Sequence, residues 1–191
     1  MFKKFLVVAI VFGALAGFAG VGSALFTDSA AVDANSFTTG TIDISTNPTT
    51  AVVTFSNMAP GDDVTAPIVI ANDGSLELRY AVTSAATDAD SKGLMSQLDF
   101  TIKSGVTVCD NAGFATDGTV VYATNDLGSL AGINVIGDPT TGAQAGDRVL
   151  AASANETLCF NVVLPIGTGN AYQDATTTAT FTFAAEQTVN N

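Results

Sequence analysis

Two stretches of the chain alternate apolar and polar residues with a period of two, and this pattern constrains the fold more than any other feature. In the first, Leu76, Leu78, Tyr80 and Val82 alternate with Glu77, Arg79, Ala81 and Thr83. In the second, Thr177, Ala179, Phe181 and Phe183 alternate with Thr176, Thr178, Thr180 and Thr182. Successive side chains of a strand point to opposite faces. Each stretch therefore predicts a strand that buries its first-named set and exposes its second.

Turn signals rich in Gly, Pro and Asn separate these stretches from several shorter ones. The other expected strands are residues 37–44, 51–57, 65–71, 98–103, 106–109, 119–123 and 157–165, and the last strand is expected within 171–187. The 65–71 run is nearly all apolar, which is typical of a strand covered on both faces. Residues 87–95 predict a loop that leads into a short helical turn. Many short strands of this kind predict an all-β fold, a jelly-roll-like β-sandwich with short helical turns in its loops.

The first 24 residues have the layout of a secretory signal peptide. Lys3 and Lys4 begin it, an apolar run follows, and small residues lead to the expected cut between Ala24 and Leu25. The alternative is a retained membrane anchor, because the run approaches the about 20 apolar residues that a span needs. We expect cleavage, a secreted protein outside the cell or at its surface, and no membrane segment in the mature form.

The chain is strongly acidic and contains no histidine. Eighteen Asp and Glu stand against six Lys and Arg, of which Lys3 and Lys4 leave with the leader. Nucleic-acid binding depends on cations that neutralise phosphates, so no nucleic acid is expected as a partner. The absence of histidine excludes Ser-His-Asp and Cys-His catalysis and the HExxH zinc site. We expect neither an enzyme nor a bound cofactor or metal ion.

Two cysteines, Cys109 and Cys159, remain in the mature chain. Outside the cell an even pair usually forms a disulfide, and two thiolates without histidine are too few ligands for a metal site. We therefore expect one disulfide between them.

Two local motifs leave alternatives open. Residues 88–93 place two aspartates and a glycine at calcium-loop positions, but Lys92 stands where an oxygen ligand is expected. A polar loop is the better interpretation. Asn155 begins a glycosylation sequon, whose use depends on the host.

Several short motifs occur in a recognisable order along the chain. They are LFTD at 25–28, FTTGTIDI at 37–44, MAPGD at 58–62, NDGSL at 72–76 and FTFAAEQ at 181–187. In this order and spacing they resemble the TasA/camelysin (CalY) family of secreted biofilm-matrix fibre proteins, to which archaeal bundling pilins are related. The middle of the chain does not share the match, and the two cysteines depart from TasA.

The resemblance implies a jelly-roll domain that is exported with a dedicated signal peptidase and joins copies of itself in an extracellular filament. Assembly would use donor-strand complementation, in which the N-terminal strand of one subunit completes a sheet of the next. The expected organisation is a signal peptide at 1–24, a donor-strand segment at 25–36 and one β-sandwich domain at 37–191.

The donor segment has the alternation that this mechanism needs. Its apolar face carries Phe26, Ala30, Val32 and Ala34, with Asp28 as the exception. An isolated strand cannot cover its own apolar face, so the segment requires a groove. The alternative is a first strand folded into its own sandwich. Gly40 is expected to supply a bend beyond the segment.

Two other functions stay open. The first is a monomeric secreted adhesin or binding module, which the acidic surface would suit. The second is a secreted metallopeptidase, because camelysin members have been described as such. The missing histidine ligands give the second little support.

Overall fold

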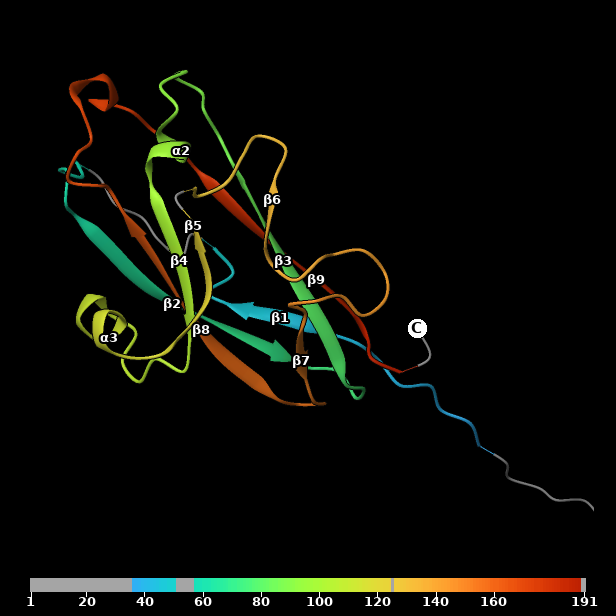
Figure 1. Ribbon diagram of the computed structural model, residues 1–191. Coiled ribbons are helices and arrows are strands. Elements are labelled where there is room, and N and C mark those ends of the chain that lie inside the picture. The colour runs from blue at the N-terminus through green and yellow to red at the C-terminus, as the bar shows by residue number, and fades with distance from the viewer. Residues whose placement is uncertain (1–35, 51–56, 125, 190–191) are drawn as a thin grey trace, which may run out of the picture. The chain divides into compact units, whose positions relative to one another are not determined.

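The computed structural model describes residues 36–50, 57–124 and 126–189 (Figure 1). Residues 39–191 form one compact unit, and residues 36–38, the described part of the other unit, have no regular structure. The signal peptide with Ala24 and Leu25, the donor face of Phe26, Ala30, Val32 and Ala34, and the strand expected at 51–57, except for its last residue, lie outside the described residues.

Strands make up most of the regular secondary structure in the described chain, with only short helical segments between them. The strands are β1 (Ile44–Asn47), β2 (Asp63–Asn72), β3 (Leu78–Ala86), β4 (Asp99–Ser104), β5 (Thr119–Thr124), β6 (Ile133–Ile136), β7 (Arg148–Leu150), β8 (Asn155–Val163) and β9 (Ala179–Gln187). The helical segments are α2 (Leu94–Gln97), α3 (Asn111–Thr116) and the 3-10 turn η1 (Asn170–Tyr172). The short helical turn expected after the 87–95 loop is confirmed as α2.

The strands form two antiparallel sheets. The first has the order β1-β2-β8-β4-β5. The second is built on β3, which pairs with β9 along one edge and with β7 and then β6 along the other. Figure 1 shows β3 and β9 side by side over their length. Successive segments of the chain pass between the sheets, with β2, β3 and β4 alternating, so the expected all-β sandwich is confirmed.

The core lies between the two sheets and has aromatic rings at its centre. Phe100 of β4 and Phe160 of β8 come from the first sheet and Phe181 of β9 from the second. The Phe181 ring centroid lies 5.4 Å from that of Phe100 and 5.0 Å from that of Phe160. Burying one such ring contributes about 1.5–3 kcal/mol, so these contacts hold the sheets face to face. The alternating residues of the predicted 98–103 strand, Leu98, Phe100 and Ile102, are buried.

A partly buried ionic cluster also joins the two sheets. The Tyr80 hydroxyl on β3 donates to Glu156 Oε1 on β8 at 2.6 Å. Arg148 Nε on β7 donates to both oxygens of the same carboxylate, at 2.9 and 3.0 Å. Burial, followed by the bond to Glu156, raises the pKa of Tyr80 far above its ordinary value. Tyr80 therefore remains a neutral hydrogen-bond donor at neutral pH.

β3 departs from its predicted alternation because both of its faces are covered. Arg79 and Ala81 were expected to face outward, yet they are 8% and 3% exposed. Residues 138–141 border the same side of the strand, and the loop that holds them covers the predicted outer face. Leu76, expected inward, precedes the strand and is 37% exposed.

Two strand boundaries and the burial of a third strand also differ from the prediction. β1 begins at Ile44 and not at residue 37, because the backbone just before it bonds to the turn at 73–76 and not to a neighbouring strand. β9 begins only at Ala179, since the preceding residues bond to the 87–90 loop. β2 is not covered on both faces: its burial alternates along the strand, with the buried residues facing the second sheet.

The prediction of a strand at 106–109 is wrong, because these residues form a loop that leads into α3. Thr107 N donates to the carboxylate of Asp117 at 2.8 Å, and Cys109 is held by its disulfide to Cys159. The backbone here therefore bonds within a local loop and makes no strand ladder.

A buried asparagine joins two turns of the sandwich. Asn72, at the end of β2, is 1% exposed. Its side-chain nitrogen lies 2.8 Å from the carbonyl oxygen of Leu76, and 3.1 and 3.0 Å from those of Leu150 and Ala151. Its side-chain oxygen accepts a hydrogen bond from Gly74 N at 3.0 Å. One side chain thus fixes the β2–β3 turn to the β7–β8 turn, and an apolar residue cannot replace it.

The Asn72→Ala variant should lose about 2 kcal/mol of unfolding free energy, because buried carbonyl oxygens are left without donors. The measurement is urea unfolding followed by circular dichroism. Asn134→Ala, at an exposed position of β6, is the matched control and should stay within about 0.5 kcal/mol of the wild type. Equal losses in the two variants would contradict the account of the buried asparagine.

Candidate functional site

Among the described strands, β9 lies at the edge of its sheet, and its inner face is only partly covered. It pairs with β3 from Ala86–Ala179 to Leu78–Gln187, and within the described ranges no strand pairs with its other edge. Phe181 and Phe183 point into the core but remain half-buried. Edge strands offer backbone donors and acceptors to a further strand. The β9 edge is therefore the candidate interaction site of the domain.

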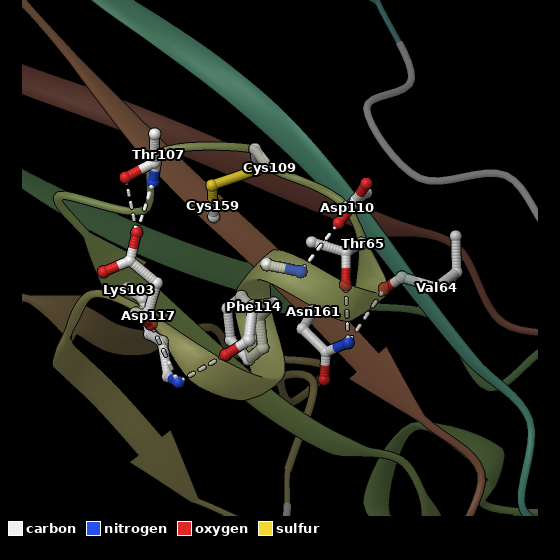
Figure 2. Close-up of a disulfide and its surroundings, with 11 residues drawn as sticks. Val64, Thr65, Lys103, Thr107, Cys109, Asp110, Phe114, Asp117, Cys159 and Asn161 are labelled. Carbon is white, nitrogen blue, oxygen red and sulfur yellow. Dashed lines mark hydrogen bonds between the residues drawn. A yellow bond between two sulfur atoms is a disulfide. The ribbon is translucent and has the colours of Figure 1, made fainter.

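A disulfide-tethered segment covers part of the outer face of the first sheet. Figure 2 shows Cys109, in the loop before α3, joined to Cys159 of β8. The structure thus contains the predicted disulfide, with Cα atoms 5.7 Å apart. Cys159 and Asn161 lie on the face of β8 that points away from the core, yet they are 1% and 5% exposed. They are buried because α3 lies over them, with Phe114 directed inward.

Polar contacts hold both ends of α3 (Figure 2). Asp110 caps the first turn, since its Oδ1 accepts from Gly113 N at 2.7 Å. At the other end Lys103 Nζ donates to the carbonyl oxygen of Phe114 at 2.5 Å and lies 4.6 Å from the centroid of that ring. Sequence reasoning missed this helix. The signal that could have found it is the capping aspartate at position 110.

The aspartates of the 88–93 loop are occupied by backbone donors. Asp88 accepts from Gly93 N at 2.8 Å. Asp90 accepts from Lys92 N at 3.1 Å and from Thr176 N at 2.7 Å. These bonds are those of a polar loop that ties itself to the segment before β9. Asn155, the sequon residue, is exposed at the first position of β8.

Carboxylates elsewhere have the same use. The aspartates that accept hydrogen bonds from nearby backbone or hydroxyl groups are Asp62, Asp73, Asp88, Asp90, Asp110, Asp117, Asp138 and Asp147. The bond from the backbone of Thr176 lowers the pKa of Asp90, and the bond from the hydroxyl of Thr107 lowers that of Asp117. Many of the carboxylates that make the chain acidic therefore stabilise its turns and loops.

In the part of the chain that the structure describes, no three His, Cys, Asp or Glu side chains gather closely enough to hold a metal ion. A polar hollow of about 190 Å³ lies beside Arg79 and is bordered by Asp138, Asp147 and Glu186. Glu186 is already paired with Arg79 at 2.5 Å and accepts from Gly142 N at 2.9 Å. No helix among the described residues is long and apolar enough to cross a membrane.

Comparison with known proteins gives one family. The family described as camelysin metallo-endopeptidase matches residues 1–191. No curated protein matches the chain. The match extends over the middle of the chain, which the short sequence motifs did not cover.

Replacing both cysteines by serine should lower the unfolding free energy by about 4 kcal/mol, which is the chain-entropy value for a closed loop of this size. The two cysteines are separated by 50 residues. Denaturant unfolding without reductant measures the change. Val108→Ser, in the same loop and 58% exposed, is the control and should have little effect. A double-serine variant as stable as this control would contradict the tethering account.

Asp117→Asn should change how the unfolding free energy depends on pH in the acid range. The lowered pKa of Asp117 means that its contribution is complete above the ordinary value of 3.8 and is lost as the pH falls through the lower folded value. The difference in unfolding free energy between wild type and variant should therefore shrink below about pH 4. Asp174→Asn, at an exposed position, is the control. A difference independent of pH would contradict this assignment.

Proposed function

The chain belongs to the camelysin family, and we propose that it is the structural subunit of an extracellular filament, assembled by donor-strand complementation. The family consists of extracellular or cell-surface proteins, and membership in it suggests a secreted protein related to biofilms. In the proposal the partner is another copy of the chain, and a dedicated signal peptidase releases the donor segment by cutting between Ala24 and Leu25.

The observation that carries the proposal is the half-buried aromatic pair on β9. Phe181 and Phe183 complete the core from an edge strand, so one side of each ring lies next to the position that a further strand would take. Side chains directly opposite one another on paired strands lie about 4.5–5.5 Å apart. A strand added beside β9 would bury the remaining aromatic surface and pair with the backbone of residues 179–185 along this edge.

The donor segment matches this edge in length and pattern. Residues 25–34 and the 9 residues of β9 give strands of nearly equal length, since each residue advances about 3.3 Å. Phe26, Ala30, Val32 and Ala34 share one face, which would lie against the core beside the β9 aromatic residues. The opposite face carries Thr27, Ser29 and Asp33 and would remain in solvent, as the threonines of β9 do.

The proposed role is structural and not catalytic. The family description names a metallo-endopeptidase, but the whole chain lacks histidine, the commonest protein ligand of catalytic zinc. A pure protein that digests casein and loses this activity with a chelator would favour a peptidase instead. A protein that stays as single globules under the electron microscope would favour the adhesin.

Val32→Asp should prevent polymerisation of the mature protein, because it places an unpaired carboxylate on the face that enters the groove. We expect the critical concentration for assembly to rise at least about tenfold, measured by sedimentation and electron microscopy. Asn35→Asp adds the same charge to the opposite face of the segment and is the matched control, which should assemble like the wild type. Removing residues 25–34 should leave soluble monomers. Normal filaments from the Val32→Asp variant would contradict the donor-strand mechanism.

A further inference from the structure

Two segments far apart in the sequence close on one another at the start of the domain. Residues 40–43 lie against the turn at 73–76. Thr41 N donates to Ser75 Oγ at 3.0 Å, and Thr41 O accepts from the backbone nitrogens of Ser75 and Leu76 at 3.0 and 3.1 Å. We call this arrangement the clasp. Its two sides, residues 40–43 and 73–76, belong to the sequence motifs FTTGTIDI and NDGSL.

The clasp needs two glycines because its segments touch. A Cβ atom at Gly40 would lie 2.5 Å from Leu76 Cγ, and one at Gly74 would lie 2.5 Å from the carbonyl oxygen of Thr41. Gly40 does not have a positive φ, so the need for glycine there is one of space. The clasp is also tied to the core, since Gly74 N donates to the buried side chain of Asn72.

The position of the clasp suggests its role. Thr41 is the first of the described residues that hydrogen-bonds to the rest of the domain. In a donor-strand filament the segment before it would be held in the neighbouring subunit. Tension along the filament would then reach the domain first at Thr41, and pass through the 73–76 turn and Asn72 into the core.

We infer that the clasp is the mechanical joint between the donor segment and the domain. This inference rests on the proposed function and assigns to the clasp a role separate from strand pairing at the β9 edge. A joint of this kind affects how filaments resist force and leaves the stability of the isolated domain nearly unchanged, because the clasp lies at the exposed periphery of the sandwich.

The test uses Gly40→Ala, whose added methyl group meets the flexible side chain of Leu76 and so allows folding. Filaments of wild type and variant are sheared under equal conditions and their lengths are measured by electron microscopy. We expect the breakage rate of the variant to rise about tenfold through loss of clasp hydrogen bonds. Leu76→Ala added to Gly40→Ala makes room for the methyl group and should restore the wild-type breakage rate.

The thermal denaturation midpoint of each variant, measured on protein lacking residues 25–34, serves as the structural control and should fall by no more than about 4 °C, the shift that about 1 kcal/mol causes in a domain of this size. Variant filaments that break at the wild-type rate would overturn the inference, and so would a breakage rate that the double variant fails to restore. Absence of filaments from the wild-type protein would overturn the proposed function and this inference with it, whereas intact assembly with unchanged breakage overturns the inference alone.

Discussion

The pairing of β3 with β9 is the interaction on which the rest of the domain depends. It joins the first long alternating stretch of the chain to the last, in a continuous register from Leu78–Gln187 to Ala86–Ala179. This pairing places Phe181 over the aromatic residues of the opposite sheet and so closes the core. Among the described strands it also places β9 at the edge of its sheet, with Phe181 and Phe183 half-buried there.

The acidic character of the chain is explained by local structure. Aspartates cap α3, hold the 88–93 loop and order the loop that covers β3, each by accepting bonds from backbone or hydroxyl groups. For Asp90 and Asp117, bonds of this kind favour the ionised form and lower the pKa of the carboxyl group. Many of the carboxylates that make the chain acidic are therefore used in turns and loops.

The sequence predicted the parts of the fold whose burial depends on local alternation. The strand at 98–103 and the end of β9 fall into this group, since the parity of their residues alone sets which side chains face the core. Arg79 was misassigned because its cover comes from a loop some sixty residues later, about 138–141, which parity cannot reveal. The helix α3 was missed because a disulfide and the outer face of the first sheet hold it in place. Both failures come from contacts between distant segments.

The candidate site divides in the same way. The disulfide could be predicted from the two cysteines and the expected location outside the cell, and the structure contains it. The β9 edge could not be predicted, because an edge is a property of the whole sheet and not of one strand. The donor face and the cleavage point lie outside the described residues, so the sequence pattern remains their basis.

The measurement that tests donor-strand assembly most directly is a cryo-electron microscopy map of filaments grown from the mature protein. Donor-strand assembly at β9 predicts that residues 25–34 of each subunit lie as a strand along β9 of the next, with Val32 and Ala34 against Phe181 and Phe183. Filaments in which this segment pairs within its own subunit, or lies away from the β9 edge, would contradict it.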